Sequence, residues 1–153
     1  MCVLELKIPP PAVGLLVGGL MWLVKRATPA LNFMFPGRHS VAILVAIAGA
    51  VIIGLGIVSF SRAKTTVNPM KPDSASSLVV SGIYAMTRNP MYLGLFVILI
   101  GWAMFLSNAL AFVCLPLFIL YLNRFQIEPE ERALAALFGG AFAVYRSRVR
   151  RWL

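Results

Sequence analysis

The chain has 153 residues, of which 60% are hydrophobic and only 12% are charged. Soluble domains carry about 25% charged residues, so this composition excludes an ordinary water-soluble fold. The formal net charge of +9 suits nucleic acid, but no nucleic-acid-binding motif accompanies it, and we predict no such partner. We also predict no metal site.

Charged residues leave three long uncharged windows, at residues 8–24, 40–61 and 89–123. A membrane-spanning helix needs roughly 20 apolar residues, so the second window predicts one span. The third is too long for a single span and is interrupted by Ser-Asn at 107–108, which predicts two short helices joined by a tight turn. The first window begins at the prolines 9–11 and completes a set of about four predicted spans.

The basic residues are distributed unevenly over the two sides of such a bundle. With four spans, the N-terminus, the segment 62–88 and the tail from Arg124 share the side that carries most of them. The other side holds only three: Lys25, Arg26 and Arg38. Because an excess of Lys and Arg marks the cytoplasmic face, we expect both polar segments in the cytoplasm. The basic cluster 146–151 is expected to anchor the tail on anionic headgroups, with Trp152 at the interface.

The first of these polar segments contains several helix breakers. Pro69, Pro72 and the polar cluster 73–77 predict a loop. The following stretch SLVVSGIY, residues 77–84, is rich in Val and Ile and is compatible with an extended chain. Gly82 permits a turn there before a short helical stretch.

The next apolar window opens with TRNPMYLG, residues 87–94. Pro90 suits the first turn of a helix, where its missing N–H has no partner to lose. Asn89 before it is a favourable N-cap. A capped helix start with Arg88 at the membrane surface accounts for these three residues, but it gives no reason for Tyr92.

A last helix is predicted with Pro129 at or near its start and with Glu130 and Glu131 at its positive N-terminal end. Its apolar residues recur on one face: Leu134, Leu137, Phe138 and Ala141. At about 100° per residue, Glu130 projects within roughly 30° of the middle of that stripe. An acid on an apolar face costs free energy unless it is bonded, which singles out Glu130. Gly-Gly at 139–140 is expected to break or kink the helix.

Two separated motifs, in order, carry a family resemblance. GIYAMTRNPMYLG at 82–94 is followed, after a helical hairpin, by EERALAALFGGAFAVYRSRVRRW at 130–152. The pair resembles the isoprenylcysteine carboxyl methyltransferase and phospholipid methyltransferase superfamily, over about residues 60–153. Members are integral membrane enzymes that bind S-adenosylmethionine at the cytoplasmic surface, between the hairpin helices and the C-terminal segment.

The resemblance and the composition together predict one all-α integral membrane domain over residues 1–153. The N-terminal spans occupy 8–61, and the cofactor-binding catalytic core, with its cytoplasmic C-terminal helical segment, occupies 62–153. We therefore expect a multi-pass membrane protein in contact with membrane lipids, with its active site on the cytoplasmic side.

The resemblance also implies site residues. The cofactor-binding positions are Leu78, Val79, Tyr84, Asn89, Pro90, Met91, Tyr92 and Glu130. Candidates for orienting the acceptor are Arg88, Arg124 and Glu131. The two tyrosines offer rings to the adenine or the sulfonium, and Glu130 offers a carboxylate to ribose hydroxyls or to the cofactor's positive charge. Methyl transfer is an in-line displacement that depends mostly on positioning and desolvation.

Two positions depart from the family pattern. The prenylcysteine enzymes carry an arginine four residues before the first paired acid, where it meets the substrate carboxylate. Gln126 stands there in this chain, with Arg124 out of register. Phe142 replaces a tyrosine of many relatives. Carboxyl methylation of a prenylated protein is therefore not implied, and a thiol, an amine headgroup, an isoprenoid carboxylate and a phenol all fit as acceptor groups.

The sequence thus predicts an S-adenosylmethionine-dependent methyltransferase acting on a lipophilic acceptor, of open oligomeric state. One alternative is a small four-helix membrane transporter, which needs an ionisable group inside a span. All five acids lie outside the predicted spans: Glu5, Asp73, Glu128, Glu130 and Glu131. Two further alternatives are a membrane NADPH-dependent reductase, for which no nicotinamide motif is recognisable, and a non-catalytic relative that retains the pocket.

Overall fold

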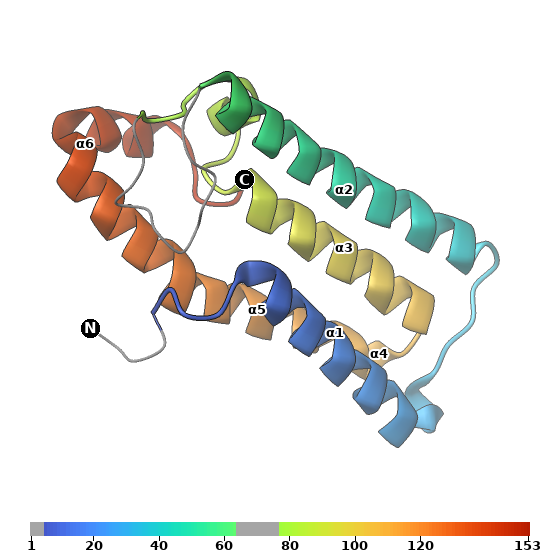
Figure 1. The fold of residues 1–153 in the computed structure, drawn as a ribbon. Coiled ribbons are helices and arrows are strands. Elements are labelled where there is room, and N and C mark those ends of the chain that lie inside the picture. The colour runs from blue at the N-terminus through green and yellow to red at the C-terminus, as the bar shows by residue number, and fades with distance from the viewer. Residues whose placement is uncertain (1–4, 64–76) are drawn as a thin grey trace.

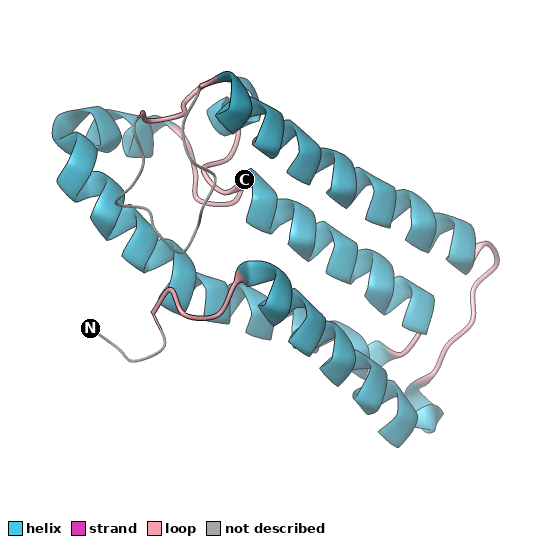
Figure 2. Ribbon diagram, in the orientation of Figure 1, coloured by secondary structure: helices cyan, strands magenta, loops and turns pink. Residues whose placement is uncertain are grey.

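The computed structural model describes residues 5–63 and 77–153. Over these residues the chain is helical, and the only extended pairing is an isolated bridge between Asn32 and Asn108 (Figure 2). The longer helices are α1 (Pro10–Ala27), α2 (Arg38–Arg62), α3 (Pro90–Leu106), α5 (Cys114–Leu122) and α6 (Glu128–Arg148). Short turns connect them: η1 (Pro29–Leu31), η3 (Gly82–Ala85), α4 (Ala109–Phe112) and the π-helix η4 (Asn123–Ile127).

Helices lie at each of the four predicted spans. By length and composition, two helical runs in the described chain qualify as membrane spans, Arg38–Arg62 and the run Ala109–Arg148, while α3 is apolar but shorter. The tight turn at 107–108 is present as predicted: Ser107 has a φ of 51°. The Asn108 side chain then caps α4 by accepting from two backbone N–H groups, at 3.0 and 3.1 Å.

Glycines allow α2 and α3 to pack in backbone contact. A Cβ built on Gly49 would lie 2.6 Å from the Gly94 carbonyl oxygen, and one on Gly94 would lie 2.6 Å from the Gly49 oxygen. At Gly101 the nearest atom is the Ala42 oxygen, at 2.8 Å. Small residues at such an interface are the usual means of helix association in membranes.

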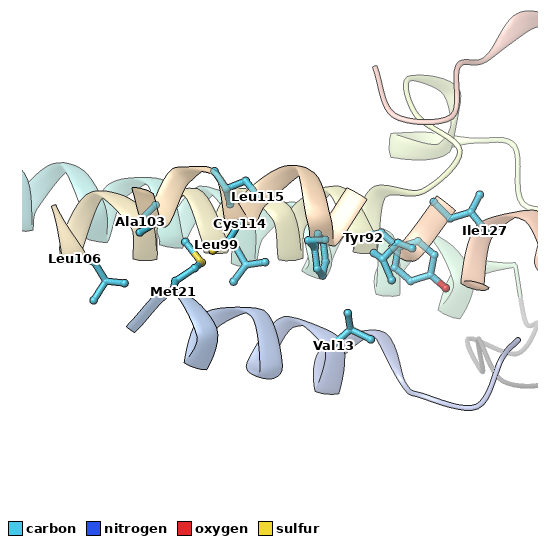
Figure 3. Packing of buried hydrophobic residues seen from close by; sticks show 12 residues of the cluster. Val13, Met21, Tyr92, Leu99, Ala103, Leu106, Cys114, Leu115 and Ile127 are labelled. Atoms are coloured by element: carbon cyan, nitrogen blue, oxygen red, sulfur yellow. The ribbon is translucent and has the colours of Figure 1, made fainter. Parts of the chain in front are cut away.

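The main core fills the space between α1, α3 and α5. Met21 and Phe118 are fully buried in this core, and Met21 lies beside Leu99 of α3 (Figure 3). The outer helix faces carry exposed apolar side chains instead of polar ones, among them Leu15 and Leu44. An exposed surface of this kind matches lipid as its surroundings.

Pro129 lies in the first turn of α6, which begins at Glu128, as the sequence predicts. No break precedes this helix, because α5, η4 and α6 form one continuous helical run (Figure 1). Proline lacks the N–H that would bond four residues back. The carbonyl oxygen of Phe125, four residues before it, instead accepts from the Leu6 N–H at 3.0 Å. The carbonyl group that Pro129 cannot bond therefore serves to attach the N-terminal segment.

The predicted kink in α6 is confirmed. Gly139 has φ 49° and ψ −120°, and the second half of α6 folds back so that the C-terminus lies beside the start of α3 (Figure 1). A small second core joins both halves of α6 to the segment before η3: Leu78, Leu134, Phe138, Phe142, Tyr145 and Val149. The predicted apolar stripe is wrong for Leu137 and Ala141, which are exposed, because this core lies on the Leu134 side of the helix.

The predicted extended stretch at 77–84 is present in part. Residues 78–80 have no regular structure, and Gly82, with a φ of 64°, begins the short helical turn η3 as expected. The loop predicted from Pro69 and Pro72 lies outside the described residues.

Candidate functional site

A cavity of about 310 Å³ opens where α1 begins, α3 begins and α6 begins, closed on one side by η3 and the segment before it. Most of its lining is apolar. Nine of the residues predicted from the resemblance line it: Leu78, Val79, Tyr84, Arg88, Asn89, Met91, Tyr92, Glu130 and Glu131. Pro90 and Arg124 do not. A volume of this order is at the lower end of the range for small-molecule sites.

Tyr92 and Glu130 meet across this cavity. The Tyr92 hydroxyl, on the first turn of α3, donates a hydrogen bond to a Glu130 carboxylate oxygen of α6. Gln126 Nε2 donates to the same oxygen at 2.6 Å. The acid that the helical periodicity placed on a buried face is therefore bonded from two sides through one oxygen, and the residue lines the cavity.

Gln126 was not predicted as a functional residue. It is buried, one helical turn before Glu130, so its amide stands over the same face of the helical run. The sequence contains a signal for this contact, because side chains four residues apart on a helix, such as Gln126 and Glu130, lie next to each other. In this chain the position holds Glu130 in place, whereas the relatives described above have an arginine that meets substrate.

A second polar group joins Arg88, Glu131 and Arg151. Arg88 Nη1 lies 3.0 Å from Glu131 Oε1. Arg151 donates to both oxygens of the same carboxylate, from Nε to Oε1 at 3.1 Å and from Nη2 to Oε2 at 2.8 Å. A bidentate pair of this kind is both strong and directional. The hydrogen bond to Glu131 raises the pKa of Arg151, whereas burial lowers the pKa of Arg88.

The C-terminal residues do not all serve as a headgroup anchor. Arg146, Arg148 and Arg150 are exposed as expected. Arg151 turns inward to Glu131, and Trp152 Nε1 donates to Asn123 Oδ1 at 3.0 Å. Both side chains, which are partly exposed, therefore have partners within the protein. They face the protein because α6 folds back at its kink and delivers them to the start of α3.

Asn89 occupies the N-cap position of α3, but the predicted capping bond is absent. Its Nδ2 instead donates to the Arg151 carbonyl oxygen at 2.9 Å. The neighbouring Arg88 N–H donates to the Arg150 oxygen at 3.0 Å. The amide is thus used as a donor to the returning tail, which lies beside the helix start. Pro90, buried at the first helical position, directs the chain into α3.

Tyr84 is held from behind by α6. The Tyr145 hydroxyl donates to the Tyr84 carbonyl oxygen at 2.8 Å. The rings of Tyr84 and Phe60 pack edge to face, with their centroids 5.2 Å apart. Burial raises the pKa of Tyr84, so its hydroxyl stays neutral at physiological pH. Phe142, which replaces a family tyrosine, is buried in the cavity wall.

Arg124 lies outside the cavity, and its side chain is 51% exposed. It pairs with Glu5 at 3.2 Å and with Glu128 at 3.6 Å. Glu5 also binds Arg132 at 2.8 Å. The predicted place of Arg124 near a bound acceptor does not match this position. Its contacts instead hold the N-terminal segment, whose prolines 10–11 line the cavity.

Comparison with known proteins agrees with this architecture. The model of the phospholipid methyltransferase family matches residues 38–141, from the start of α2 to just beyond the kink in α6. The chain belongs to this family. The match takes in Tyr84, Tyr92 and Glu130, so the central residues of the cavity belong to the phospholipid methyltransferase region.

Individual relatives resemble parts of the chain. A protein-S-isoprenylcysteine O-methyltransferase of Schizosaccharomyces pombe is 31% identical over 122 residues, which are 78% of this chain and 50% of the relative. The Homo sapiens protein of that name is 37% identical over 73 residues, 48% of this chain and 26% of its own length. An uncharacterized Haemophilus influenzae protein is 46% identical over 63 residues, 41% of this chain and its entire own length. The chain thus spans half or less of the two named methyltransferases.

Proposed function

We propose that this member of the phospholipid methyltransferase family is an S-adenosylmethionine-dependent methyltransferase that acts on a lipophilic acceptor at the membrane. The observation that carries the proposal is the shared cavity of Tyr92 and Glu130. Two polar stretches, far apart in sequence, contribute to one hollow and are hydrogen-bonded across it. Two simpler roles, a capped start of α3 and an acid that interacts with the dipole of α6, do not explain why Tyr92 and Glu130 are hydrogen-bonded to each other.

The residues around the cavity fit the cofactor. S-adenosylmethionine supplies an electrophilic methyl group on a positively charged sulfur. Glu130 has a carboxylate oxygen for the ribose or for that charge, and Tyr84 and Tyr92 present rings at which a cation gains about 0.5–2 kcal/mol. The apolar wall from Leu78, Val79 and Met91 excludes water, which strengthens each of these interactions.

The same proposal includes four membrane spans and a cytoplasmic site. The N-terminal segment, the start of α3 and the C-terminal tail gather at one end of the bundle, and the α1–α2 connection lies at the other (Figure 1). The first end carries most of the basic residues, which favours the cytoplasm. Apolar lining residues such as Ile53, Phe60 and Leu95 suit an acceptor that arrives from the bilayer.

The transporter alternative gains no support from the described acids. Glu5, Glu128, Glu130 and Glu131 lie outside α1, α2, α3 and α5. An ion pathway through these helices would need an ionisable group within one of them.

Calorimetry in detergent tests the proposal, with S-adenosylhomocysteine as the ligand. We expect the wild type to bind and Glu130→Gln to weaken binding at least about tenfold, because a charged hydrogen-bonding partner contributes about 1.5–3 kcal/mol. The control is Glu128→Gln, an acid two residues away that lies outside the cavity and is half-exposed. A wild type without affinity, or equal effects of both variants, would refute the proposed site. Transfer of a labelled methyl group into a total lipid extract then identifies the acceptor.

A further inference from the structure

Arg88 has more hydrogen-bond donors than described partners. A guanidinium carries five N–H donors, and that of Arg88 is paired with Glu131. Its Nε is buried and has no hydrogen-bond partner within residues 5–63 and 77–153. The side chain is only 10% exposed and lines the cavity. A buried charged donor without a partner is costly unless a bound ligand supplies one.

The charges around Glu131 are also unbalanced. This one carboxylate serves two guanidinium groups, those of Arg88 and Arg151. The other described acids are engaged elsewhere: Glu130 with Tyr92 and Gln126, and Glu5 and Glu128 with Arg124. Arg151 is 29% exposed, so water reaches it, whereas Arg88 is enclosed. Among the described residues, Arg88 is therefore an enclosed cation that shares its one carboxylate with a second guanidinium.

The cavity wall thus has an acceptor at one place and a donor at another. Glu130 offers a carboxylate oxygen, and Arg88 offers a planar guanidinium whose N–H groups can bind both oxygens of a carboxylate. A ligand with an ammonium or sulfonium group and a carboxylate would complement both. We propose that Arg88 binds the carboxylate at the amino-acid end of the cofactor. This inference rests on the proposed function and assigns the polar end of the same ligand.

A carboxylate on the acceptor would satisfy the same guanidinium. The cofactor is favoured because Asn89, the next residue, and Tyr92, one helical turn further on, line the same cavity together with Tyr84. The acceptor carboxylate is therefore an outcome that the experiment must separate from the proposed one.

The test compares two ligands by calorimetry: S-adenosylhomocysteine and its analogue that lacks only the carboxylate. We expect the wild type to bind the first at least about tenfold more tightly. Arg88→Met is expected to abolish this preference by weakening the first ligand alone, and Arg88→Lys to restore only part of it. Arg38→Met, a half-buried arginine at the start of α2 that does not line the cavity, is the matched control and should behave as the wild type.

The outcomes separate the two proposals. If the wild type binds both ligands equally, the role of Arg88 is refuted while cofactor binding stands, and loss of lipid methylation in Arg88→Met would then place the carboxylate on the acceptor. If Arg88→Met weakens both ligands by the same factor, Arg88 has only a structural role, which also refutes the inference. If the wild type binds neither, the proposed function itself fails. The wild-type comparison needs no variant, so it remains valid even if Arg88→Met does not fold.

Discussion

Hydrogen bonds of single side chains explain why the cavity residues are of these types. Glu130 accepts from Tyr92 and Gln126, which come from different helices. Because the interior is poor in water, each such bond has a larger effect when its partner is removed than it would at the surface. Side chains with the same chemistry elsewhere in the chain serve as controls.

Tyr92→Phe removes the hydroxyl that donates to Glu130 and keeps the ring. We expect about tenfold weaker binding of S-adenosylhomocysteine in calorimetry, since removing one partner of a buried bond costs about 1–3 kcal/mol. Tyr121→Phe is the control, because the Tyr121 hydroxyl is buried without a partner in the described part of the chain. Equal affinities for the two variants would contradict the role of the Tyr92–Glu130 bond.

Asn89→Asp distinguishes a helix cap from a contact to the tail. If Asn89 acted as an N-cap, aspartate would replace it well. In this structure the amide donates to the Arg151 oxygen, and a carboxylate there faces another acceptor. We therefore expect destabilisation by about 1–3 kcal/mol, seen as a lower unfolding temperature in detergent. An unchanged or higher unfolding temperature would favour the cap.

At the scale of helices, the contact between α2 and α3 fixes the position of α3 and so of Tyr92 in its first turn. Gly49 and Gly94 each leave space for the other's carbonyl oxygen. Helices in lipid gain little from burying apolar area against each other, so close packing has to supply the association. The kink at Gly139 likewise sets the direction of the second half of α6. It requires glycine, because a φ of 49° with a ψ of −120° is a conformation that residues with a Cβ avoid.

Gly49→Ala is expected to separate α2 from α3, since the added Cβ would lie 2.6 Å from a backbone oxygen. Overpacking of this kind costs about 1–3 kcal/mol, which lowers the unfolding temperature in detergent. Gly54→Ala, on the same helix with no atom within 4 Å of its added Cβ, is the matched control. It should be neutral or stabilising through helix propensity. A smaller effect at Gly49 than at Gly54 would contradict the proposed contact.

At the scale of the whole molecule, the N-terminal segment and the C-terminal tail hold the elements and residues that line the site. The tail 149–153 bonds to the start of α3 through the Asn89 amide and reaches Glu131 through Arg151. The N-terminal segment is attached to α6 by Glu5, which pairs with Arg132, and to η4 by the Leu6 N–H, which donates to the Phe125 carbonyl oxygen. These contacts join segments separated by most of the sequence, so the cavity exists only in the complete fold.

Deletion of residues 150–153 is expected to abolish binding of S-adenosylhomocysteine at ligand concentrations that saturate the wild type. It removes Arg151, one of the two partners of Glu131, and the carbonyl groups that hold Arg88 and Asn89. Deletion of the exposed Leu153 alone is the control and should leave affinity unchanged. Helix content by circular dichroism should be the same for both proteins. Retained affinity in the longer deletion would show that the tail does not close the site.

Local patterns in the sequence determined the helices, the turn at 107–108, the kink at Gly139 and the buried orientation of Glu130, because each depends on residues within a few turns of one another. Only the tertiary structure decided which partner each polar group takes. Asn89 donates to the tail, Arg151 turns inward and Arg124 lies outside the cavity. A hydrogen-bonding group selects among the partners that folding brings near it, and no periodicity within a single segment encodes that choice.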